Sequence, residues 1–140
     1  MLEAHNYFRC LHDSDAMTLS AKMKKQAKTA VDTSAATGGL KHSFKGENLA
    51  LIQIPISDAT GFGITKMWYD EIKDYNYDDF KKSTGVVGHF TQVVWADSSK
   101  LGCASTVDIK GNTQIACEYD PPGNYATVED HVDNVNRPIS

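Results

Sequence analysis

The strongest constraint on the fold is a pair of alternating segments late in the chain, joined by a short turn. Residues 101–107 and 113–119 both follow the period of two that is typical of a β-strand. If residues 109–111 form a three-residue hairpin loop with glycine in its left-handed position, the strand register is set by the turn. Cys103 then lies directly opposite Cys117, and this register predicts a disulfide between two antiparallel strands.

Three earlier segments have the periodicity of amphipathic helices. They cover residues 2–12, with Leu2, Asn6, Arg9 and Leu11 near helical spacing, and residues 19–34 and 64–75, each with apolar side chains on one stripe. Residues 124–140 show neither period, so they are expected to form an irregular tail. Helices first and an antiparallel hairpin late predict an α+β fold rather than a parallel βαβ fold.

Length and charge narrow the function classes. The chain has 140 residues, one domain's worth, and a net charge of −4 with scattered acidic residues. This balance argues against a nucleic-acid surface, which needs concentrated Lys and Arg. Lys22, Lys24, Lys25 and Lys28 cluster on the second predicted helix, as a solvated face or as a peripheral contact with an anionic membrane. No apolar run approaches the ~18 residues of a membrane span.

Two histidines and two glutamates are the candidates for chemistry. They are His42, Glu47, Glu71 and His89, and all four lie beside aromatic or glycine-rich segments. Taken singly, each histidine is most simply a half-buried structural residue. Brought together, each Glu would orient one imidazole and leave its other nitrogen free for a divalent ion. Such a site would be weak and open compared with the three or four protein ligands of typical zinc sites.

Five ordered motifs resemble those of one family. GHFTQVVW at 88–95 and IACEYDPPGNY at 115–125 resemble the two signature segments of the CAP superfamily of cysteine-rich secretory, antigen five and pathogenesis-related proteins. HNYFR at 5–9, GENLA at 46–50 and WYDE at 68–71 are similar to three further family segments, in the family's order. The resemblance includes the compact Golgi-associated branch and the secreted venom-allergen-like branches.

The resemblance implies a fold and a site. It implies a single domain over residues 1–140, built as a three-layer α-β-α sandwich with a central antiparallel sheet. Carried over by motif, His42 and His89 are the metal ligands for a weakly bound divalent cation, zinc or magnesium. Glu47 and Glu71 are expected to orient these two imidazoles rather than to bind the cation. A rich disulfide frame is not implied, because the residues before GEN and GHFT are not the cysteines of most secreted members.

The same resemblance implies a lipid ligand, a sterol or a fatty-acid-like molecule. An apolar stretch broken by two glycines offers material for a groove or mobile loop. Its candidate lipid-binding residues are Ile52, Ile54, Ile56, Phe62 and Ile64.

Two alternative functions stay open. One is a metal-dependent or serine-type hydrolase in the same cleft, with Ser43, Ser83 or Thr84 as the nearest hydroxyls, although none has a motif context. The other is a defence, allergen or venom-like protein recognised by a receptor. The expected localisation is extracellular, with the Golgi or the cytoplasmic face of a membrane as the alternative. We expect a monomer or weak homodimer, with Cys10 as a free thiol.

Overall fold

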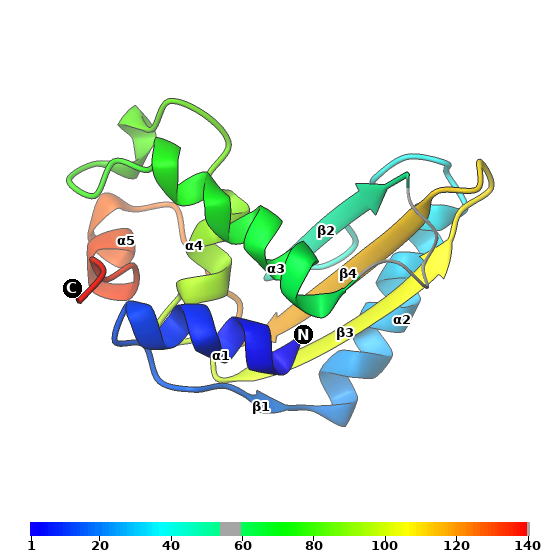
Figure 1. The fold of residues 1–140 in the computed structure, drawn as a ribbon, viewed down its shortest axis with the longest axis horizontal. Helices are drawn as coiled ribbons and strands as arrows, with labels where there is room; N and C mark the ends of the chain where they lie inside the picture. Colours follow the sequence, from blue (N-terminus) through cyan, green and yellow to red (C-terminus); the bar gives the residue numbers. More distant parts are fainter. Residues whose placement is uncertain (54–59, 140) are drawn as a thin grey trace.

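The computed structural model describes residues 1–53 and 60–139, which surround a four-stranded sheet (Figure 1). The strand order is β1 (Thr18–Leu19), β3 (Lys100–Val107), β4 (Thr113–Asp120) and β2 (Glu47–Ile52). The three long strands are antiparallel, whereas the two-residue edge strand β1 pairs parallel to β3. The α+β class is confirmed, and the sheet is mixed only at that edge.

Helices cover both faces of the sheet (Figure 1). The helix α2 (Ala21–Ala35) packs against β3 and β4 on one face. On the other side α1 (Leu2–Leu11), α3 (Gly61–Tyr69) and α4 (Gly88–Val94) pack against one another. This arrangement confirms the three-layer sandwich. Two 3₁₀ turns, η2 (Asp70–Asp74) and η3 (Phe80–Lys82), connect α3 to α4.

The hairpin has the register that its turn predicts. Asp108 donates its backbone N–H to the carbonyl of Asn112 at 2.8 Å, and Gly111 has φ +82°. Cys103 pairs with Cys117 across β3 and β4, and the two form a disulfide. The remaining cysteine, on α1, is free and exposed.

Two helix boundaries differ from the sequence periodicity. Leu19 belongs to β1, and α2 begins only after Ser20, whose hydroxyl oxygen accepts a hydrogen bond from the backbone of Met23 at 3.2 Å. The α3 helix ends at Tyr69 and continues as the 3₁₀ turn η2 rather than as α-helix to residue 75.

The expectation of an irregular tail over residues 124–140 is wrong in one part. The helix α5 (Val128–Asn134) forms there. Thr127 caps it, because its hydroxyl oxygen accepts a hydrogen bond from the backbone N–H of Asp130 at 3.0 Å. Glu129 and Asp130 add negative charge to the first turn, where the helix dipole favours it. Within the described residues, no helix combines the length and apolarity needed to cross a membrane.

A buried arginine ties α1 to the segment that follows α4. Arg9 is inaccessible to solvent and burial lowers its pKa to about 10, so it stays charged at neutral pH. Its five N–H groups donate to backbone carbonyls at 2.8–3.4 Å; the acceptors are Asp15, Val93, Trp95, Ala96 and Ser98. The guanidinium therefore supplies the hydrogen-bond donors that these five backbone carbonyls would otherwise find in water.

Candidate functional site

The first half of the candidate site is a contact between His42 and Glu47. Glu47 is the first residue of β2, and its side chain is buried, whereas the His42 side chain is 62% exposed. The Nδ1 of His42 hydrogen-bonds to Oε1 of Glu47 at 2.9 Å, and the backbone N–H of Ser43 donates to the same oxygen at 3.1 Å. Because the buried carboxylate holds Nδ1, Nε2 of His42 is the ring nitrogen left for a ligand.

The second half repeats the arrangement with His89 and Glu71. The Nδ1 of His89 hydrogen-bonds to Oε2 of Glu71 at 2.7 Å. Oε1 of Glu71 accepts from the backbone N–H groups of His89 and Phe90 at 2.9 and 3.0 Å. Glu71, from η2, therefore caps the N-terminus of α4 and orients the imidazole that α4 carries. The His89 ring also stacks on Trp68 from α3, with 6.1 Å between the ring centroids.

Residues of β2 connect the two halves. Asn48, next to Glu47, donates from Nδ2 to the carbonyl of His89 at 3.1 Å and to the hydroxyl of Tyr119 at 3.2 Å. The indole N–H of Trp68 donates to the carbonyl of Leu49 at 3.2 Å. The strand thus holds α4 and α3 in place beside the first His–Glu pair.

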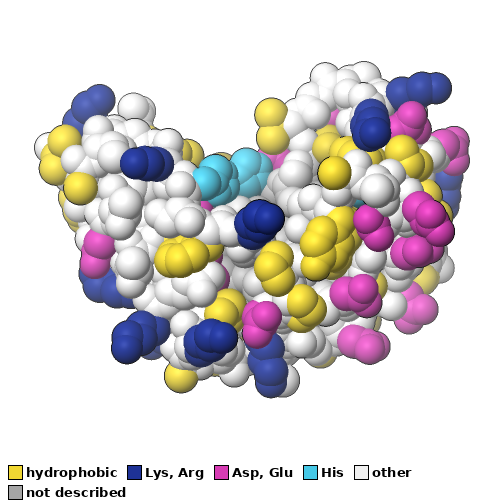
Figure 2. Space-filling model, turned by 180° about the vertical axis from the view of Figure 1, so that it is seen from behind, with side chains coloured by type: hydrophobic (Ala, Val, Ile, Leu, Met, Phe, Trp, Pro, Cys, Tyr) yellow, Lys and Arg dark blue, Asp and Glu magenta, His cyan; other side chains and the backbone are white. Residues whose placement is uncertain are grey.

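Histidine side chains lie on the floor of a hollow between two lobes (Figure 2). His5, His12 and His131 are buried, whereas the His42 and His89 side chains are 62% and 28% exposed. The described residues hold no group of three or more His, Cys, Asp or Glu side chains arranged around one metal position. The donors that this hollow offers are therefore two imidazoles, each backed by a carboxylate.

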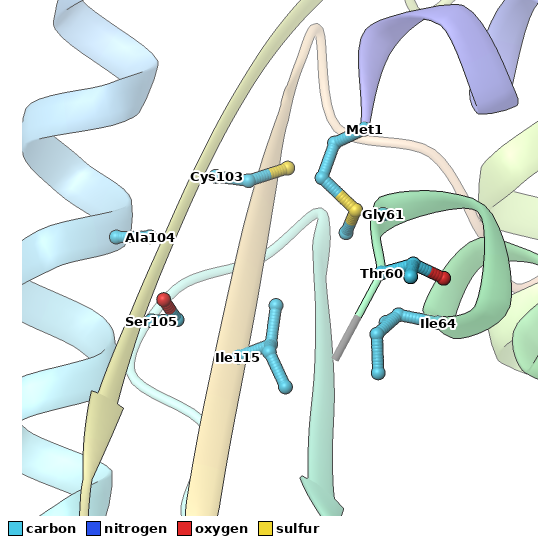
Figure 3. A pocket seen from close by; sticks show the side chains of 8 residues that line it. All are labelled: Met1, Thr60, Gly61, Ile64, Cys103, Ala104, Ser105 and Ile115. Carbon is cyan, nitrogen blue, oxygen red and sulfur yellow. The ribbon is translucent and has the colours of Figure 1, made fainter. Parts of the chain in front are cut away.

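A small apolar cavity lies between the sheet and the start of α3 (Figure 3). Its volume is about 180 Å³, and Ile64 and Ile115 extend toward each other across it, close to Cys103 and Met1 (Figure 3). Of the other candidate lipid-binding residues, Phe62 is 49% exposed and stacks on Phe8 instead of lining the cavity.

The remaining candidates lie away from that cavity or outside the described residues. Ile52 is half-buried at the end of β2 and packs against the main core. Ile54 and Ile56 lie outside the described residues.

A second, larger cavity is also lined by Met1. Its volume is about 620 Å³, within the usual range of small-molecule pockets. The first turn of α1, the segment from β1 to the start of α2, and β3 line this open cavity; its residues are Met1, Leu2, Glu3, Leu19, Ser20, Ala21, Lys24, Leu101, Gly102 and Cys103. The sequence periodicity had assigned Leu19 to a helix stripe and so did not indicate this cavity.

The three hydroxyls nearest the histidines in sequence, those of Ser43, Ser83 and Thr84, are the candidate nucleophiles of a hydrolase. The Ser83 hydroxyl accepts from the backbone of Asn76 at 3.0 Å, and the Thr84 hydroxyl donates to Asp74 at 3.2 Å. Within the part of the chain that the structure describes, none of these three hydroxyls hydrogen-bonds to the ring of His42 or His89. A nucleophile–base pair needs such a contact, although it is often looser without substrate.

Fold and site together define a class of protein. The chain belongs to the CAP family, described as the cysteine-rich secretory protein family, whose family model matches residues 2–119. One relative, pathogenesis-related protein 1 of Arabidopsis thaliana, is 48% identical over 81 residues, which are 58% of this chain and 48% of the relative. The Golgi-associated plant pathogenesis-related protein 1 of Homo sapiens is 33% identical over 130 residues, 89% of this chain and 82% of the relative.

Solved structures share the fold at low sequence identity. Na-ASP-1 superposes with a TM-score of 0.76 at 22% identity, over 97% of this chain and 40% of that one. The structure of NaASP2 with Zn²⁺ superposes with a TM-score of 0.61 at 22% identity, over 89% of this chain and 78% of that one. These similarities confirm the sandwich fold expected from the motifs.

Proposed function

We propose that this chain binds a divalent cation, zinc or magnesium, weakly through Nε2 of His42 and of His89, with water completing the coordination. One observation carries the proposal: both histidines have Nδ1 hydrogen-bonded to a glutamate, which is the usual support of a metal-ligating imidazole. A solved structure with the same fold holds Zn²⁺. The Cys103–Cys117 disulfide supports an extracellular location, since disulfides persist in oxidising compartments.

Zinc titration tests this proposal by calorimetry. We expect saturable binding at pH 7.5 that is lost in the His42→Ala, His89→Ala double variant and weakened at pH 5, because a protonated imidazole has no free lone pair. All proteins carry Cys10→Ser, since the exposed Cys10 thiol is itself a zinc ligand. Equal affinity in the double variant and its Cys10→Ser parent would contradict the site.

We propose further that an apolar ligand, a sterol or a fatty acid, occupies the larger cavity and reaches toward the smaller one. Met1 and Cys103 line both, so the two cavities adjoin. Met1, Leu2 and Leu19 supply apolar surface, and Lys24 offers a cation for an acidic headgroup. Removal of apolar surface from water drives such binding, at about 25 cal/mol per Å² before association costs.

Radiolabelled cholesterol and palmitate test the lipid proposal. Leu19→Asp should weaken binding about tenfold or more, because it places a carboxylate in the apolar wall. Phe62→Asp is the matched control: Phe62 is similarly exposed but lines neither cavity. His89→Ala should leave lipid affinity unchanged. Absence of saturable binding by the wild type would refute the proposal, and ester or peptide turnover that depends on His89 would favour the hydrolase instead.

A further inference from the structure

A second glutamate lies beside Glu47, out of contact with solvent. Glu118 on β4 pairs with Glu47 of β2 in the strand register, so both side chains lie on the face that α2 covers. Gly102 is the partner of Glu118 on its other side. A Cβ at Gly102 would collide with the backbone of Met23 and Lys24, so α2 lies directly on the sheet here and excludes water.

The hydrogen bonds of the two carboxyl groups are unequal. Oε1 of Glu47 accepts two donors, His42 Nδ1 and the N–H of Ser43. Glu118 accepts one, from Nε2 of Gln26 at 3.0 Å, and the described residues give it no Lys or Arg partner. Among the described residues, Oε2 of Glu47 and Oε2 of Glu118 are both buried and have no hydrogen-bond donor.

The strand register places the Glu47 and Glu118 side chains next to each other on this buried face, without water between α2 and the sheet to solvate them. Two ionised carboxylates only accept hydrogen bonds and would repel each other here, so burial of the pair without a cation favours a proton on one of them. Burial, and then the contact with Glu47, raise the pKa of Glu118 well above its ordinary value. We place the proton on Glu118, because it accepts one hydrogen bond whereas the Glu47 carboxylate accepts two, which stabilise its negative charge.

We propose that Glu118 is a neutral carboxylic acid that donates a hydrogen bond to Oε2 of Glu47 and is thereby a positioning residue for His42. The series Gln26–Glu118–Glu47–His42 runs from the buried face of α2 to the hollow. With both oxygens of Glu47 engaged, its carboxylate keeps one orientation and holds His42 in the tautomer with the proton on Nδ1. The effect of Glu118 on cation binding rests on the proposed function. Its effect on the orientation of His42 does not depend on a bound cation.

The first experiment uses the wild-type protein without metal. The ¹³C shift of the Glu118 side-chain carboxyl at pH 7 is expected to be that of a protonated acid. A carboxylate shift would overturn the proposal without any variant.

The second experiment compares Glu118→Gln with Glu118→Met, both checked for the native amide spectrum. The Gln amide donates as the acid does, so the Nδ1–H tautomer of His42, followed by ¹⁵N NMR, and the zinc affinity should stay within twofold of wild type. The Met variant has no donor, so the tautomer should shift toward Nε2–H and zinc affinity should fall about tenfold. An unchanged tautomer in Glu118→Met would overturn the positioning role. Absence of zinc binding in the wild type, with the tautomer shift present, would refute the cation site alone.

Discussion

Replacing Arg9 with methionine is expected to lower the free energy of unfolding by about 4 kcal/mol. The substitution keeps the length and apolar stem of the side chain but removes all five donors, so five carbonyls lose their partner, three of them in fully buried contacts. Loss of one side of a buried polar contact costs more than replacement of both sides, because the stranded group is neither paired nor hydrated.

Two further variants separate this effect from the loss of a positive charge. Arg9→Lys keeps the charge but has three donors on one nitrogen, so we expect a loss of about 2 kcal/mol. Arg137→Met is the control, since Arg137 pairs with Asp78 at 3.2 Å while both side chains are largely exposed. Such surface pairs contribute about 0–1 kcal/mol. Urea unfolding measures the stability of all three variants. An Arg9→Met protein as stable as the Arg137→Met control would contradict a stabilising role for the Arg9 hydrogen bonds.

Arg9 also illustrates what the sequence could not predict. Its helical spacing placed it correctly in α1, but its partners are backbone carbonyls, which every residue has and which leave no mark on a sequence. The hairpin is the opposite case. Its register follows from a local turn, so the Cys103–Cys117 pairing could be predicted from residue numbers alone.

The other features that the sequence did not predict resemble Arg9 in this respect, because they depend on pairings between distant segments of the chain. The strand β2 was not predicted, because ENLALI does not alternate; it is buried on both faces between α2 and the other helices. Without β2 there was no register to place Glu118 beside Glu47. The His–Glu contacts of the hollow were likewise expected only through the resemblance, because His89 and Glu71 are 18 residues apart.

The buried network behind the hollow requires a neutral His5. Asn48 donates to the hydroxyl oxygen of Tyr119 at 3.2 Å, and this hydroxyl lies 2.6 Å from Nε2 of His5. The Nδ1 of His5 lies 2.9 Å from the carbonyl oxygen of Met1. All these groups are satisfied when the Tyr119 hydroxyl donates to Nε2 and Nδ1–H donates to Met1. A proton on Nε2 would face that hydroxyl with a second donor.

Acid is therefore expected to destabilise the fold through His5. Burial lowers the pKa of His5 to about 4, whereas in the unfolded chain it is about 6.5. Between these values the unfolded chain binds a proton that the folded chain does not, so stability is complete above pH 6.5 and falls as the pH falls toward 4. At about 1.4 kcal/mol per pH unit, the full window is worth about 3 kcal/mol.

A His5→Gln variant isolates this contribution, because glutamine has a donor and an acceptor but does not titrate. Urea unfolding at pH 7 and pH 4.5 should show that the wild type loses about 2 kcal/mol more than the variant over this interval. Burial also lowers the pKa values of His12 and His131. Both histidines are present in the wild type and in the variant, so the stability that they cost at low pH cancels in the comparison. If the two proteins lost equal stability between these pH values, His5 would have to be protonated in the fold, and the Asn48–Tyr119–His5 network would need the opposite hydrogen-bond directions.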